Sequence, residues 1–145
     1  MAKSKHAAFA QDPQNGTAVL TAAGNPDGSN AVLLYTAGIE GALINGAKAG
    51  PRGTITPNGV ILFKEKAGTT DRVAFSSITV PGWDVSVAAN LTKAMPIAKD
   101  PDISVTNPDY LGRGDKVYAA LLSDTPNGIG VVLTVQEFHD VGGGA

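Results

Sequence analysis

Few residues of this chain could do chemistry, and they are far apart in the sequence. Its two histidines, His6 and His139, lie near opposite ends. His139 stands beside Glu137 and Asp140, a set that could hold a cation, but such sites usually need several converging ligands. We therefore interpret this group as the solvated end of a strand. Because the chain has no cysteine, disulfides, thiolate metal sites and cysteine nucleophiles are excluded.

The aspartates offer carboxylates, but they stand in segments that are typical of turns. They are Asp27, Asp71, Asp84, Asp100, Asp102, Asp109 and Asp124. Asp100, Asp102 and Asp109 share a proline-rich segment and could cradle Ca²⁺, although the calcium-loop spacing with its terminal glutamate is missing. Paired catalytic carboxylates would need a shared cleft. We expect instead that these side chains cap turns by accepting hydrogen bonds from nearby backbone N–H groups.

Known catalytic and nucleotide-binding motifs are missing from the sequence. There is no Gly-x-Ser-x-Gly nucleophile elbow and no glycine-rich phosphate loop that opens a helix. The tripeptide Arg113-Gly114-Asp115 matches the integrin-binding motif, but we interpret it as a loop from which Asp115 leads into a strand. We predict no catalytic residue, no metal and no cofactor.

Composition narrows the class of protein further. The chain has 145 residues, of which 43% are hydrophobic and 17% charged, with 18 glycines and 9 prolines. This combination favours many short strands and tight turns over a helical bundle or a disordered chain. The net charge of −2 argues against binding nucleic acid through a basic face. No run approaches the roughly 20 apolar residues of a membrane span, and we expect no secretory signal and no membrane contact.

The elements that must position any site are best defined in residues 59–80. Two runs of β-forming residues flank a polar linker that contains Gly68, which predicts a β-hairpin. The apolar alternation in its second run changes parity at Ser76-Ser77, which predicts a bulge. A second hairpin is predicted for residues 115–123 and 129–138.

The tetrapeptide Thr-Pro-Asn-Gly occurs twice, at residues 56–59 and 125–128, each time before an apolar run. They predict two turns of the same build, and gene duplication or turn chemistry alone would explain the match. Further strands are predicted at residues 17–22, 30–37, 38–48 with a bulge near Gly41, 84–87, and at an edge over 102–106.

These patterns predict an all-β fold, an antiparallel β-sandwich or jelly roll of about eight short strands. We expect residues 1–16 to form an N-terminal arm without a fold of its own, either loose or lying on a neighbouring subunit. Residues 17–140 form a single domain in this interpretation, and residues 141–145 a flexible tail.

Three aromatic residues are predicted as possible interface anchors. Trp83 follows a Pro-Gly corner, Tyr110 lies in the proline-rich segment, and Phe9 lies in the arm. Aromatic residues in loops are enriched at protein interfaces, whereas the other large aromatics are expected in the core.

The order of these segments carries a resemblance. A hairpin with a short polar turn begins at Val60, returns to Ile78-Thr-Val-Pro-Gly, and is followed by the segment from Gly112 to Ser123 and a last apolar strand. This order is similar to small β-sandwich virion proteins of tailed bacteriophages, among them capsid decoration or cement proteins. The likeness is one of rhythm and turn placement and covers roughly residues 30–138. It implies no enzyme activity, a place on the capsid surface, and homotrimers that bind the major capsid protein and stabilise the head.

Two other functions stay open. A tail, fibre or surface β-sandwich could bind a carbohydrate or a receptor through residues 95–110, and a small hydrolase could use the same scaffold. Function cannot be inferred from fold alone.

Overall fold

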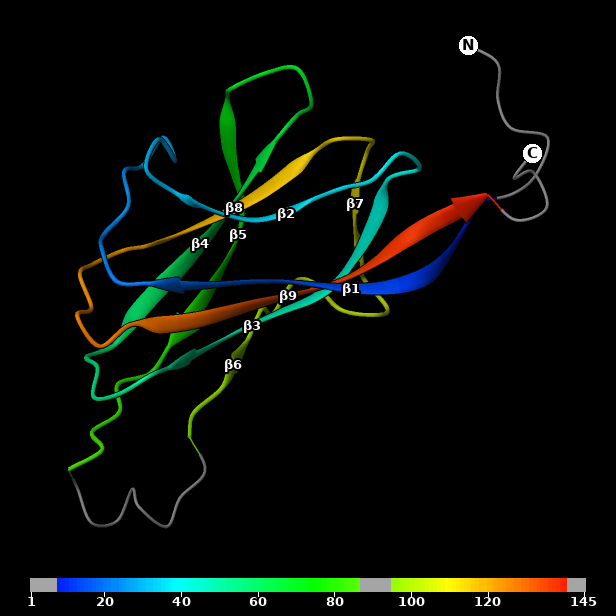
Figure 1. Ribbon diagram of the computed structural model, residues 1–145. Helices are drawn as coiled ribbons and strands as arrows, with labels where there is room; N and C mark the ends of the chain where they lie inside the picture. Colours follow the sequence, from blue (N-terminus) through cyan, green and yellow to red (C-terminus); the bar gives the residue numbers. More distant parts are fainter. Residues whose placement is uncertain (1–7, 87–94, 141–145) are drawn as a thin grey trace.

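The computed structural model describes residues 8–86 and 95–140, and the side chains of residues 12–86 and 95–138. Two antiparallel sheets pack face to face (Figure 1), which confirms the predicted all-β sandwich. No helix able to span a membrane occurs in this part of the chain.

Within residues 8–86 and 95–140, nine strands make the two sheets. Sheet A has the order β1 (Ala8–Leu20), β9 (Ile129–Asp140), β3 (Ala42–Pro51) and β6 (Ala98–Lys99), and β7 (Asp109–Leu111) also pairs with β3. Sheet B has the order β2 (Val32–Thr36), β8 (Lys116–Leu121), β4 (Asn58–Glu65) and β5 (Arg72–Val80).

The core lies between the sheets and follows from alternation along the strands. In β9 every second residue from Ile129 to Val135 is fully buried, while Val132 between them is 38% exposed. Each such buried aliphatic side chain stabilises the fold by about 1.5–3 kcal/mol relative to an exposed one. Sheet B contributes the facing layer, which includes Val60, Leu62, Ile78, Val80, Val117 and Leu121.

The hairpin predicted at residues 59–80 is confirmed as β4 and β5. Gly68 in its turn has a φ of 82°, a left-handed conformation that glycine adopts without strain. Leu62 pairs with Ser76 and Phe63 with Ala74, so Phe75 is the extra residue of a β-bulge. The predicted bulge is therefore present, one residue before the predicted position.

The second predicted hairpin is wrong. Its strands exist as β8 and β9, but β8 pairs with β2 and β4 in sheet B, whereas β9 pairs with β1 and β3 in sheet A. The connection crosses the end of the sandwich, where the Leu122 N–H donates to the Gly59 carbonyl and the Thr125 N–H to the Thr21 carbonyl. These two bonds hold the connection across the sheets instead of letting it fold back as a turn.

The two Thr-Pro-Asn-Gly tetrapeptides also differ in structure, so the prediction of two turns of the same build is wrong. Gly128 has a φ of 87° and closes a turn by donating its N–H to the Thr125 carbonyl. Asn58, in the other copy, is the first residue of β4, and its buried side chain bonds to the β8–β9 connection. The tetrapeptide at residues 125–128 makes a turn, whereas Asn58 of the tetrapeptide at residues 56–59 binds the segment that leads into that turn.

The expected N-terminal arm is also wrong for residues 8–16, because they belong to β1. This strand pairs with β9 from Ala8 to Leu20, and Gly16 sits so close to β2 that a Cβ there would be 2.3 Å from the Leu34 carbonyl oxygen. β3 pairs with β9 only over Ile129 to Glu137 of β9. Beyond Glu137, β1 and β9 extend past the other strands as a two-stranded ribbon (Figure 1). The remainder of the arm, residues 1–7, and the tail at residues 141–145 lie outside the described residues.

Three shorter strand predictions need correction. Residues 38–41 form a turn in which Gly41 has a φ of 82°, and the irregularity in β3 falls between Ile44 and Gly46 instead. Residues 84–86 form a turn that Asp84 closes by accepting a hydrogen bond from the Ser86 N–H; residue 87 lies outside the described part. Residues 102–106 are bends, and the edge is supplied by β6 and β7.

A loop covers part of the outer face of sheet B. Phe63, Tyr118 and Ala120 form a small buried cluster there. The Arg72 guanidinium lies 3.7 Å from the centre of the Tyr118 ring and donates to the carbonyl of Gly28 in the loop of residues 23–31. This clamp holds the loop on sheet B, whereas the part of the chain that the structure describes leaves Val19 and Val132 exposed on the outer face of sheet A.

Candidate functional site

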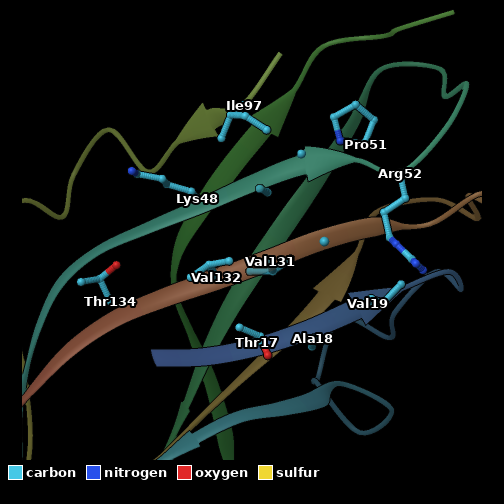
Figure 2. A pocket seen from close by; sticks show the side chains of 13 residues that line it. Thr17, Ala18, Val19, Lys48, Pro51, Arg52, Ile97, Val131, Val132 and Thr134 are labelled. Atoms are coloured by element: carbon cyan, nitrogen blue, oxygen red, sulfur yellow. The ribbon is translucent and has the colours of Figure 1, made fainter. Parts of the chain in front are cut away.

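The open outer face of sheet A carries an apolar depression of about 630 Å³. It lies across β1, β9 and β3, with one contact from the segment before β6 (Figure 2). Its lining residues are Thr17, Ala18, Val19, Lys48, Ala49, Gly50, Pro51, Arg52, Ile97, Gly130, Val131, Val132 and Thr134.

The floor of the depression exists because strand register places two glycines side by side. Gly50 of β3 pairs directly with Gly130 of β9, and Gly130 pairs with Val19 of β1. A Cβ added at Gly130 would have no neighbour nearer than 4.0 Å, the Gly50 carbonyl oxygen. The backbone at Gly130 is therefore left uncovered, and glycines in strands often mark a place where another group approaches closely.

Aliphatic side chains surround this floor. Val19 is 49% exposed, Val132 38% and Ile97 54%. Ile97 leans over Gly50, where an added Cβ would lie 2.5 Å from its Cδ1 atom. Together these side chains form a shallow apolar binding surface that is bounded on two sides.

Two cations complete the rim. Lys48 and Arg52 are exposed, and Arg52 extends from the end of β3 toward Val19 (Figure 2). Within the described residues neither side chain has an ion pair or a hydrogen bond, and no carboxylate lines the depression. The arrangement suits a group that combines an apolar surface with a negative charge.

A second cavity, of about 540 Å³, lies between β7 and the β4–β5 hairpin and contains Tyr110. Tyr110 is 62% exposed and Val73, across the cavity, is 65% exposed. Lys64 also lines this cavity, and its Nζ atom lies 2.8 Å from a carboxylate oxygen of Asp109. Tyr110 is thus an accessible aromatic residue beside polar groups, and its role as an interface anchor stays a prediction.

The other two predicted interface residues are placed differently. Trp83 is half-buried and forms a two-bond bridge with Ile55, its N–H donating at 3.0 Å and its carbonyl accepting at 2.8 Å. Phe9 lies in β1 opposite His139, and its side chain lies outside the described part. Neither Trp83 nor Tyr110 lines the depression on sheet A.

The turn-capping prediction for the aspartates is confirmed at several positions. Asp27 accepts from Ser29 and Asp84 from Ser86, each through a backbone N–H two residues later, whereas Asp124 accepts from the N–H of Ala23, which is distant in the chain. Asp100 caps the bends after β6 by accepting from the N–H groups of Asp102 and Ile103, while Asp109 is paired with Lys64. Among the described residues no group of three or more His, Asp or Glu side chains could hold a metal ion.

Asp115, the last residue of the integrin-like tripeptide, is buried and used within the fold. One of its carboxylate oxygens accepts from the Ala67 N–H at 3.0 Å and the other from the Gly112 N–H at 2.9 Å. Burial acts to raise its pKa, but these hydrogen bonds, with the charges of Lys66 and Lys64, outweigh burial and lower the pKa below 3.8. The loop interpretation of this tripeptide is confirmed.

Glu137, which the sequence placed in a possible cation set, binds within the chain. The Tyr35 hydroxyl donates to it, and the Gly38 N–H donates to both of its oxygens, at 3.1 and 3.2 Å. Burial, followed by the hydrogen bond to Glu137, raises the pKa of Tyr35 above its ordinary value of 10.0. The side chains of His139 and Asp140 lie outside the described residues.

Sequence reasoning missed the depression itself. Its floor joins Gly50 and Gly130, which are 80 positions apart in the chain and meet only through the β3–β9 register. The available signal was a lone glycine, Gly130, inside an apolar strand pattern, which can mark a close approach of another group.

The chain matches no protein-family model, and no curated protein matches it. The class that the fold defines is an antiparallel β-sandwich with one open, partly apolar sheet face.

Proposed function

We propose that this chain is a non-enzymatic structural protein that assembles with copies of itself and with other subunits, as a capsid decoration or cement protein does on a bacteriophage head. Its partner in this proposal is the major capsid protein, and its working state is a homotrimer on the capsid surface that stabilises the head.

One observation carries the assembly role. The outer face of sheet A keeps an apolar depression with exposed Val19, Val132 and Ile97, whereas a loop covers part of the corresponding face of sheet B. Exposed apolar patches that are rimmed by polar residues mark interaction surfaces. The rim cations Lys48 and Arg52 add a charge that a partner can match.

The capsid setting is supported by the resemblance described above, which lies in the hairpin now seen as β4 and β5 and in the strands after it. The β-sandwich is the fold that this resemblance implies. Tyr110 and its cavity offer a second surface, so one face can join copies while the other contacts the capsid.

The test of this proposal uses particles. Virions should be purified from cells that carry the gene, and the ratio of this protein to the major capsid protein measured by quantitative mass spectrometry. We expect a fixed ratio, and saturable binding when purified protein is added back to heads that lack it. Tyr110→Ala should weaken this binding more than Tyr110→Phe, because the ring supplies most of the contact. Absence from purified particles, together with no affinity for heads, would refute the proposal.

The Tyr110 cavity also favours a second candidate function, recognition of a carbohydrate or receptor. An exposed aromatic ring beside Lys64, Asp71 and Thr69 combines an apolar surface with hydrogen-bonding groups. A glycan array separates the two functions. Binding that Tyr110→Ala abolishes would support the carbohydrate module, whereas a silent array with stoichiometric binding to heads would support the cement protein.

A further inference from the structure

We propose that the turn between β2 and β3 of one copy inserts Ile39 into the sheet A depression of the next copy, with Glu40 beside Lys48 and Arg52. This inference rests on the proposed function, because it names the contact through which copies of the chain assemble.

The turn presents an apolar side chain next to a carboxylate. Ile39 is 71% exposed, and Glu40, which follows it, is exposed as well. Within the described residues Glu40 has no ion pair. An exposed isoleucine at the tip of a turn adds nothing to the core of its own copy.

The turn is held rigidly from both sides. The Gly41 N–H donates to the Gly38 carbonyl at 3.1 Å, and the Phe138 N–H of β9 donates to the Gly41 carbonyl at 3.1 Å. The Gly38 N–H is bound by the carboxylate of Glu137. A segment that is ordered before binding loses little conformational entropy when it docks, so more of the contact energy appears as affinity.

The depression complements this turn in shape and charge. Its floor at Gly130 leaves room for an aliphatic side chain, with Val19, Val132 and Ile97 as walls. Its rim carries two cations and no carboxylate among the described residues, and the turn carries one carboxylate. Opposite charges at matched positions favour this partner over one that presents a cation.

The position of the two features requires two copies. Figure 1 shows the β2–β3 turn at one end of β3 and the start of β9 near the other end. From Ala42 to Gly50 the strand advances by eight residues, or about 26 Å at 3.3 Å per residue. One copy cannot fill its own depression, so the contact joins different surfaces of two copies. When such a contact repeats head-to-tail, it generates a ring or a filament. A homotrimer is a ring of this kind.

Complementation between variants tests the direction of the contact. Ile39→Asp disables the turn and Arg52→Glu weakens the depression, and each variant alone should dissociate at least about tenfold more readily in sedimentation velocity. An equimolar mixture should form a one-to-one complex and nothing larger, since only one functional turn and one functional depression remain. Independent sedimentation of the two variants, or ring assembly by either variant alone, would overturn the proposal.

A pair of glycine substitutions supplies the matched control. Gly130→Val should fill the floor, and its Cβ has space there because nothing lies nearer than 4.0 Å to it. Gly46→Val makes the same change in β3, where an added Cβ has no neighbour within 4 Å and no part in the depression. Both variants should fold, as far-ultraviolet circular dichroism will show. Gly130→Val should be monomeric and Gly46→Val should assemble like the wild type; equal behaviour of the two would refute the proposal.

These measurements are made in solution without particles, so they are independent of the test of the proposed function. Wild-type protein that binds heads as a monomer would refute the inference and keep the cement role. Wild-type rings without affinity for heads would refute the cement role and keep the inference.

Discussion

Replacing Asn58 with alanine should destabilise the sandwich strongly, because its buried side chain joins β4 to the β8–β9 connection. Its Nδ2 group donates to the Ser123 carbonyl at 2.9 Å and to the Thr125 hydroxyl at 2.6 Å. Its Oδ1 atom accepts from the Gly59 N–H at 2.8 Å and from the Ser123 N–H at 3.2 Å. Asn58 is 7% exposed and Thr125 4% exposed, so water cannot easily replace these bonds.

The size of the effect follows from the partners left behind. A typical hydrogen bond contributes about 0.5–1.5 kcal/mol net, and an unsatisfied buried partner costs about 1–3 kcal/mol. Four groups lose a partner: the Thr125 hydroxyl, the Gly59 N–H, and the N–H and carbonyl of Ser123. We therefore expect Asn58→Ala to lower the free energy of unfolding by about 3 kcal/mol. With a urea m-value of about 2 kcal/mol/M, the unfolding midpoint should fall by about 1.5 M.

Asn127, the matching residue of the second Thr-Pro-Asn-Gly tetrapeptide, supplies the control. Asn127 is exposed, and among the described residues its side chain makes a single hydrogen bond, which runs from Nδ2 to the Thr54 carbonyl at 2.7 Å. Asn127→Ala should therefore lower the free energy of unfolding by only about 0.5 kcal/mol. Urea unfolding followed by Trp83 fluorescence measures both variants. A loss below about 1 kcal/mol for Asn58→Ala, or equal losses for the two variants, would refute this reasoning.

Three further predictions concern other polar contacts. Arg72→Lys should lower the free energy of unfolding by about 1–2 kcal/mol and speed hydrogen exchange in residues 23–31, because lysine cannot both stack on Tyr118 and reach the loop carbonyl. Asp115→Asn should destabilise the fold at neutral pH, because an amide offers one acceptor oxygen where the fold uses two. Since the pKa of Asp115 is lowered in the fold, the difference in stability between variant and wild type should disappear as pH falls below 3.8. Acid titrations followed by circular dichroism measure this difference. Because the pKa of Tyr35 is raised in the fold, its protonated hydroxyl stabilises the fold fully below pH 10.0 and less as pH rises above that value. Tyr35→Phe should therefore remove part of the loss of stability that urea unfolding measures at alkaline pH. An unchanged dependence of stability on alkaline pH would contradict the hydrogen bond from Tyr35 to Glu137.

Local signals in the sequence predicted the elements whose partners are near in the chain. The β4–β5 hairpin follows from two β-forming runs around Gly68, and the parity change at Ser76 located its bulge to within one residue. The aspartate turns also follow from local chemistry, since a carboxylate and the N–H two residues later, as in Asp84 and Ser86, need no distant partner.

Long-range pairing is what the sequence could not supply. An apolar run, a turn and a second apolar run describe both a hairpin and a crossing between sheets, so β8 and β9 could not be assigned to different sheets from pattern alone. Apart from Phe9, residues 8–16 are polar or small and lack a strand pattern, and they become strand because β9 offers them a partner. The depression depends on the same register, which brings Gly50 against Gly130.

Native mass spectrometry of the purified wild-type chain tests most directly whether copies of this sandwich associate through the open face of sheet A. The account predicts a ring of three copies for the wild type and for Gly46→Val, and a monomer for Gly130→Val. Wild-type protein that stays monomeric at concentrations up to about 100 μM, far above a dissociation constant of about 1 μM, would contradict it.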